Sequence, residues 1–311
     1  MVRPDDCRTC PGKASARAPQ AIRLGDKMSK PIYRVSSISR PLEAKYPSNR
    51  AVLILLPVIL LATAALRMSQ AETSLMTAAF GGLEAMFGAF LIWAIGRELD
   101  PDRNPGAFIA MAAILPLVYL DYELSLWTLA FVLMATRVVN RTVGNPVRLG
   151  DMAVVLALAA LAVFRDGYSE MGYVAGLALA LDAFLDRKRT LNLVGAMIAV
   201  AFSMWNLIEL EGDLRALLLS AVEVMPQMAL YSALAVLVLG VLHALLLGRV
   251  HSVGDATGEP LSGLRVRGGI LIAALAGLAM LTEGEAGLMA GLGFYAAILG
   301  VVLGRFWPSG R

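Results

Sequence analysis

The sequence is poor in charged residues. Only 16% of its 311 residues are charged, 58% are hydrophobic, and the mean hydropathy is +0.69. A water-soluble globular chain carries roughly 25% charged residues. The composition therefore excludes an ordinary soluble domain and predicts an integral membrane protein.

Cysteine and histidine are almost absent, with two residues of each. Cys7 and Cys10 form a C-x-x-C pair, a spacing that suits a metal ion or a redox couple. No second pair completes a tetrahedral site, and no histidine follows Cys10 as in a c-type haem attachment motif. We therefore expect neither a metal site nor a cofactor.

Several functional motifs are also missing. There is no G-x-x-x-x-G-K-[ST] phosphate loop, no H-E-x-x-H, and no lysine within an apolar run that could form a retinal Schiff base. ATP-driven pumping and retinal photochemistry by this chain are excluded. The expected partners are the lipid bilayer, a small molecule or an anionic lipid as ligand, and either other membrane proteins or further copies of the chain. No nucleic-acid partner is expected.

Long apolar runs fill the chain after residue 50. A helix needs about 20 largely apolar residues to cross the hydrocarbon layer. Pro226 should divide the run 214–247, because proline removes a helix hydrogen bond, leaving an interfacial helix at 214–225. The predicted spans are 51–66, 73–95, 106–120, 124–136, 152–164, 171–185, 191–208, 227–247, 269–281 and 287–303.

These runs predict an all-α integral membrane protein. We expect a polytopic bundle of about ten transmembrane helices, arranged largely as short hairpins, because the connections between runs are short. Residues 51–311 form this multi-span domain. Residues 1–50 mix Arg, Lys, Ser and Pro with few aromatics, which predicts a disordered basic tail. The alternating charges of residues 96–103 predict a solvated connector.

Basic residues set the expected orientation, because Lys and Arg are enriched in cytoplasmic loops. If the tail is cytoplasmic, all but Arg67, Arg165 and Arg215 of the 27 basic residues lie inside. The predicted location is the inner cytoplasmic membrane, with several passes and both termini cytoplasmic.

Glu84 is the strongest candidate for a functional residue. It lies within a predicted span, just after Gly81 and Gly82, where small residues allow a substrate or another backbone to approach. An ionisable residue in hydrocarbon costs a few kcal/mol and marks a candidate site. Glu84 could bind a proton or a cation, or it could be a protonated carboxyl that bonds to a neighbouring helix.

Three further polar residues within predicted spans are candidate substrate-binding residues. Asp182 could bind substrate or pair with Arg187 or Arg189, one to two turns further along the helix. Asn206 could bind substrate or join two helices by a hydrogen bond. His243 could relay protons or be a packing residue.

An arginine-rich loop covers residues 137–151. Its guanidinium groups could bind phosphate with paired hydrogen bonds, which makes Arg137 and Arg141 candidates for a phosphorylated substrate or lipid head group. In the alternative interpretation, the arginines of this loop orient the chain during membrane insertion and Asp151 caps a helix.

The favoured function is a secondary transporter of a small molecule. A membrane-embedded enzyme or lipid-handling protein, acting on a phosphorylated or lipid-linked substrate at the arginine loop, is the first alternative. An accessory or scaffold subunit of a membrane complex is the second. No catalytic residue is predicted.

Overall fold

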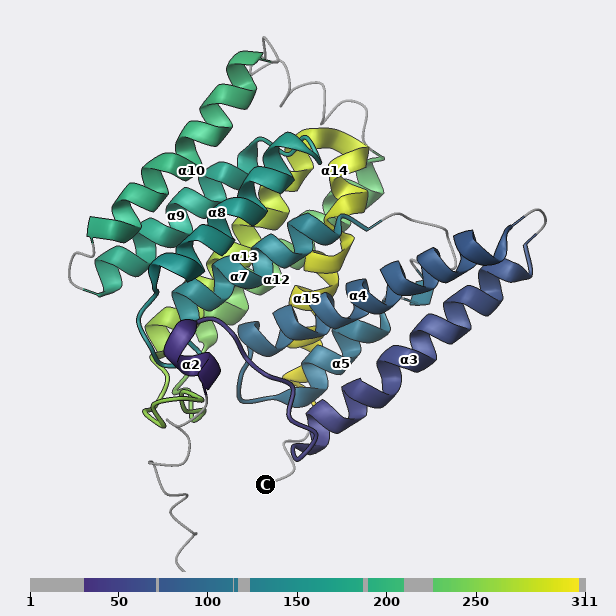
Figure 1. Ribbon diagram of the computed structural model, residues 1–311, viewed down its shortest axis with the longest axis horizontal. Helices are drawn as coiled ribbons and strands as arrows, with labels where there is room; N and C mark the ends of the chain where they lie inside the picture. Colours follow the sequence, from purple (N-terminus) through teal and green to yellow (C-terminus); the bar gives the residue numbers. More distant parts are fainter. Residues whose placement is uncertain are drawn as a thin grey trace, which may run out of the picture.

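The computed structural model describes residues 31–70, 73–113, 115–116, 124–186, 190–209 and 226–307. This part of the chain is helical (Figure 1), and its β-structure is limited to one bridge between Val253 and Pro260. The predicted all-α class is therefore confirmed for the described residues.

The helices run in the following order: α2 (Pro31–Val35), α3 (Pro47–Met68), α4 (Leu75–Leu99), α5 (Asn104–Ala112), α7 (Leu126–Asn140), α8 (Leu149–Phe164), α9 (Glu170–Leu185), α10 (Thr190–Glu209), α12 (Gln227–Leu246), α13 (Gly263–Met280), the 3-10 helix η1 (Leu281–Glu283), α14 (Gly284–Ala290) and α15 (Leu292–Gly304).

Five helical segments are long and apolar enough to cross a membrane. They are α3, α4, most of α10 (Thr190–Ile208), α12, and the continuous stretch Gly263–Ala290. Helices α7, α8 and α15 are apolar but shorter. At about 1.5 Å per residue, the 15 residues of α7 extend only about 22 Å, less than the roughly 30 Å hydrocarbon layer. The described helices are those of a membrane-spanning protein, and the count of ten spans stays a prediction.

Two predicted boundaries depend on proline and glycine. Helix α12 begins at Gln227, directly after Pro226, as the missing backbone N–H of proline predicts. The predicted interfacial helix at 214–225 lies outside the described residues.

The run 287–303 was expected to be one helix, but the structure divides it at Gly291 into α14 and α15. Gly284 has φ +65° where η1 meets α14, a conformation that favours glycine.

Close helix packing depends on small residues. Helices α9 and α10 pack so tightly that a Cβ on Gly172 would lie 2.5 Å from the carbonyl oxygen of Ala199. Between α5 and α15, a Cβ on Gly106 would lie 2.9 Å from the carbonyl oxygen of Gly300. Such contacts let membrane helices approach closely where the hydrophobic effect gives little drive for association.

Basic side chains gather at one end of the bundle, which we call the basic end. Here the C-terminal ends of α4, α7, α9, α12 and α15 meet the N-terminal ends of α5, α8, α10 and α13. Ion pairs and hydrogen bonds join them: Arg141 after α7 binds Asp182 of α9, and Arg305 after α15 donates to the carbonyl oxygen of Leu246 in α12.

Residues 31–46 fold onto the basic end. Tyr33 packs with Val143 and Ala256, and Figure 1 shows α2 beside the loop that precedes α13. The Ser36 hydroxyl and the Ser37 backbone N–H donate to Asp151, at 2.6 Å and 2.8 Å. The composition of this segment predicts disorder. Composition carries no information about a distant residue, such as Asp151, that accepts hydrogen bonds from the segment. Residues 1–30, with their C-x-x-C pair, lie outside the described residues.

Candidate functional site

Helix α4 lines two large cavities. In a helix, residues that are three or four positions apart lie on the same side. Phe87 lines the first cavity and Phe90 lines the second, so about 4.5 Å of helix separates them. The two cavities therefore follow one another along α4. The residues of this side are Phe80, Leu83, Glu84 and Phe87 in the first cavity, and Phe90, Trp93, Ala94 and Arg97 in the second.

The second cavity, which we call the basic cavity, lies at the basic end. Its volume is about 930 Å³, within the range of small-molecule sites. Its walls are α4, the end of α7, the start of α5, and residues 33–49. Its charged lining residues are Arg40, Lys45, Arg97, Arg137, Glu43, Glu98 and Asp255.

Glu98 anchors one wall of this cavity. Its side chain is 0% exposed, and Arg40 Nη1 and Arg137 Nε each lie 3.0 Å from its Oε1. Arg40 also pairs with Asp255 at 2.6 Å. Burial alone would lower the pKa of Arg40, but the carboxylates of Glu98 and Asp255 outweigh that effect and raise it. Arg40 and Arg137 are thus fixed by carboxylates of the protein itself.

Arg97 is in a different position. It lines the cavity and is partly exposed, yet it has no hydrogen bond or ion pair with any residue that the structure describes. Lys45 pairs with Glu43 at 2.7 Å. The cavity has four basic side chains and three carboxylates, which leaves one positive charge in excess, and Arg97 is the basic lining residue that makes no ion pair with the described part of the chain.

The cavity wall next to Arg97 is aromatic. Trp93 is 5% exposed, and its ring centre lies 6.2 Å from that of Phe90 and 6.4 Å from that of Phe108. Its indole Nε1 has no hydrogen-bond partner in the described structure. A buried tryptophan N–H usually finds an acceptor. The wall therefore combines apolar rings with one donor that lacks an acceptor.

The first cavity, which we call the Glu84 cavity, has a volume of about 840 Å³. It lies between the N-terminal half of α4, the start of α7, residues 165–168 and α14. Glu84 is half-buried, and its Oε1 accepts a hydrogen bond of 3.1 Å from the backbone N–H of Leu124. No basic residue among those described pairs with Glu84.

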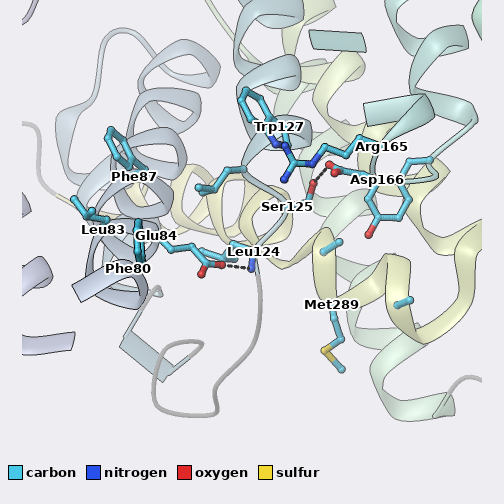
Figure 2. Close-up of a pocket in the computed structure, with 14 residues that line it drawn as sticks. Phe80, Leu83, Glu84, Phe87, Leu124, Ser125, Trp127, Arg165, Asp166 and Met289 are labelled. Carbon is cyan, nitrogen blue, oxygen red and sulfur yellow. Dashed lines mark hydrogen bonds between the residues drawn. The ribbon is translucent and has the colours of Figure 1, made fainter. Parts of the chain in front are cut away.

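The wall facing Glu84 is polar as well. Figure 2 shows Arg165 and Asp166 across the cavity from Glu84. Asp166 accepts hydrogen bonds from Ser125 at 2.5 Å and from Thr128 at 3.1 Å. The guanidinium of Arg165 lies 5.5 Å from the ring centre of Trp127, a cation–π arrangement. The Glu84 cavity thus offers charged groups of both signs.

Asp182 is the centre of a separate ion-pair cluster. It is buried, and its carboxylate accepts from Arg141 at 2.8 Å, from Arg265 at 2.6 Å and from Asn192 at 2.6 Å. Arg141 ends α7 with φ +52°, and it also pairs with Asp186. This network joins α7, α9, α10 and α13, which is a structural arrangement. Arg187 and Arg189, the partners expected from the sequence, lie outside the described residues.

Asn206 and His243 lie away from both cavities. Asn206 donates a 2.7 Å hydrogen bond to the Ser169 hydroxyl, which joins α10 to the start of α9. His243 is 5% exposed, and neither ring nitrogen has a hydrogen-bond partner within the described chain.

The structure divides the arginine loop. Arg137 lines the basic cavity, whereas Arg141 belongs to the Asp182 cluster. Asp151 caps α8 by accepting from the backbone N–H of Arg148, and it also holds residues 36–37. The loop's named side chains therefore do not meet around one phosphate-sized space.

The sequence interpretation missed Arg40, Arg97 and Glu98. The prediction that residues 96–103 form a solvated connector is wrong, because Glu98 and Asp100 are buried. Residues 96–103 carry Arg97, Glu98, Asp100, Asp102 and Arg103, so charges of both signs follow the apolar run and no local signal distinguishes Glu98 as buried.

No group of three or more His, Cys, Asp or Glu side chains in the described ranges is arranged to hold a metal ion. No protein family, curated protein or solved structure matches the chain.

Proposed function

We propose that this protein is a secondary carrier that moves a small solute across a cell's inner membrane. The observation that carries the proposal is the placement of two ligand-sized cavities in succession along α4. Secondary carriers bind their solute within the membrane between two accessible sides. In this proposal the chain crosses the membrane about ten times, and both termini lie on the cytoplasmic side with the basic end.

Phe87 and Phe90 form the barrier between the two cavities. Each lines one cavity, and they are three residues apart on the same side of α4. The solute passes from one cavity to the other when these rings change rotamer or α4 shifts against α7. Aromatic side chains suit this role because a small rotation opens or closes an apolar constriction.

Glu84 couples movement of the solute to a proton or a cation. Its carboxylate lies half-buried in a membrane helix without a basic partner among the described residues. A lone charge in hydrocarbon is costly, so binding a proton or a cation there stabilises the carrier state in which the cavity is closed to water.

Uptake into proteoliposomes tests this function. The purified protein is given radiolabelled organic acids, amino acids, nucleosides and sugars, with and without an imposed pH gradient. The expected result is gradient-driven uptake of one class, lost in Glu84→Gln but kept in Glu285→Gln, which removes an exposed acid of α14. Absence of uptake for every class would contradict the proposal.

The alternatives predict different results. An enzyme that acts on a phosphorylated lipid would turn over that substrate and lose activity on Arg137→Ala and Arg141→Ala but not on Glu84→Gln. Both arginines are already paired with carboxylates, which gives this alternative no free guanidinium at these two positions. A scaffold would purify with a stoichiometric partner and show neither uptake nor turnover.

A further inference from the structure

We propose that the basic cavity binds an organic monoanion, with Arg97 as the partner of its charged group, the Trp93 indole N–H as a second donor, and Phe90 as part of an apolar wall. This assignment names the substrate class of the proposed carrier and depends on that function for its role in transport. Binding can be measured without transport, so the two claims fail separately.

The charge of the ligand follows from the pairing within the cavity. Arg40 and Arg137 share Glu98, Arg40 also binds Asp255, and Lys45 binds Glu43. These contacts leave Arg97 as the excess positive charge. A guanidinium favours a carboxylate, sulfonate or phosphate because its planar N–H groups match two oxygens of the anion. One cation that makes no ion pair with the described residues fits one negative charge.

The aromatic wall gives a second, independent indication of a ligand. Trp93 is one turn before Arg97 on α4 and lines the same cavity, so both lie on the same side of the helix. The buried Nε1 lacks an acceptor within the described structure. Leaving a buried donor unpaired is unfavourable, because the group has given up its hydrogen bond to water without replacing it. Because Nε1 has almost no accessible surface in this structure, the Trp93 ring has to turn toward the cavity for an oxygen of the bound anion to supply that acceptor while Arg97 holds the same group.

The rest of the cavity indicates the body of the ligand. Phe90 and Leu42 contribute apolar surface, and the volume of about 930 Å³ exceeds what a bare inorganic ion fills. Ligand sites usually combine mainly apolar walls with a few polar groups that fix orientation. An anion with an aromatic or aliphatic body therefore fits better than phosphate or chloride alone.

Such an anion has two sources, a free solute or the head group of an anionic lipid. Benzenesulfonate represents the free solute, because it keeps its single charge at every accessible pH and does not cross bilayers unaided. Phosphatidic acid represents the lipid. The full chain in phosphatidylcholine nanodiscs, with or without phosphatidic acid, allows each to be added separately.

Trp93 itself supplies the measurement. Trp127, Trp205 and Trp307 are all exposed, and replacing them with Phe leaves Trp93 as the sole tryptophan. Titration with benzenesulfonate is expected to change the Trp93 emission in a saturable manner. Arg97→Gln should weaken this binding about tenfold or more, which corresponds to roughly 1.4 kcal/mol or more. Arg97→Lys should restore part of the affinity, because it keeps the charge but not the paired geometry.

Arg249→Gln is the matched control, because it removes one exposed arginine of the basic end outside the cavity. Equal loss of binding in both variants would overturn the proposal, since general surface charge would then explain it. Absence of any saturable change with either probe would also overturn it. An Arg97-dependent change with phosphatidic acid alone would keep the anion site but reject the free solute. Thermal unfolding of each variant in the absence of probe verifies that the fold is intact.

Discussion

Arg40 Nη1 and Arg137 Nε approach the same carboxylate oxygen of Glu98, each at 3.0 Å. The first arginine belongs to the segment before α3, and the second lies in the last turn of α7. One fully buried carboxylate of α4 therefore fixes two parts of the chain that are 97 residues apart in the numbering.

Replacing Glu98 should destabilise the protein strongly. Glu98→Gln keeps the size of the side chain but leaves both arginines without a shared carboxylate. Breaking a buried ion pair by removing one partner costs about 3–5 kcal/mol. We expect a lower thermal unfolding temperature in detergent, whereas Glu259→Gln, which removes an exposed acid near the same end, should leave it unchanged. Equal stability of Glu98→Gln and wild type would contradict the role of this ion pair.

Asp100 makes stability depend on pH. It caps the end of α4, is 4% exposed, and burial raises its pKa from 3.8 to about 6. Because the folded state binds the proton more tightly, the stability contributed by Asp100 is complete below about pH 4 and is lost as pH rises through 6. Asp100→Asn mimics the protonated form. Its unfolding temperature should match that of wild type at pH 4 and exceed it at pH 7.

Asp102 should change stability with pH in the opposite direction from Asp100. Burial would raise its pKa, but hydrogen bonds from Ser252 and His251 outweigh burial and lower it. This group contributes stability above its unfolded pKa, and that stability is lost as pH falls through the lower, folded pKa. Asp102→Asn should therefore lower the unfolding temperature at pH 7. The expectation for Asp100→Asn is a higher unfolding temperature at pH 7. The same gain in Asp102→Asn would contradict the opposite pKa shifts of the two carboxyl groups.

A glycine pair tests the helix packing. Gly172→Ala places a methyl group 2.5 Å from the carbonyl oxygen of Ala199, so α9 and α10 must separate. Overpacking of this kind costs about 1–3 kcal/mol. Gly150→Ala in α8 meets no atom within 4 Å and should be neutral or slightly stabilising, because alanine favours the helix. The difference in unfolding temperature between the two variants measures the packing directly, and an equal effect would contradict it.

Local patterns predicted the helical class, and the start of α12 after Pro226 follows from the chemistry of one residue. Glu84 could be selected because an acid in an apolar run is rare. The basic cavity could not be predicted in the same way. Arg40 meets Asp255 across 215 positions of sequence, and residues 31–46 acquire order from Asp151, far along the chain. Long-range pairing of this kind leaves no periodic signal in either segment.

The charge pattern of residues 96–103 also led to a wrong prediction, because it does not show which charged side chains are buried. The alternation of acid and base in residues 96–103 is typical of a solvated turn, yet Glu98 lies among arginines that replace its water. The sequence separates Arg137 from Arg141 by only one turn of helix. In the structure the first faces the basic cavity and the second faces Asp182, because α7 ends between them.

Sided labelling tests the central claim, that the two cavities on α4 open to opposite sides of the membrane. In a variant with Cys7 and Cys10 replaced by Ser, single cysteines are placed at Leu83 in the Glu84 cavity and at Phe90 in the basic cavity. A membrane-impermeant maleimide is applied to right-side-out and inside-out vesicles. Leu83→Cys is expected to be labelled from the outer side and Phe90→Cys from the cytoplasmic side. Labelling of both from one side, or of neither, would contradict the claim.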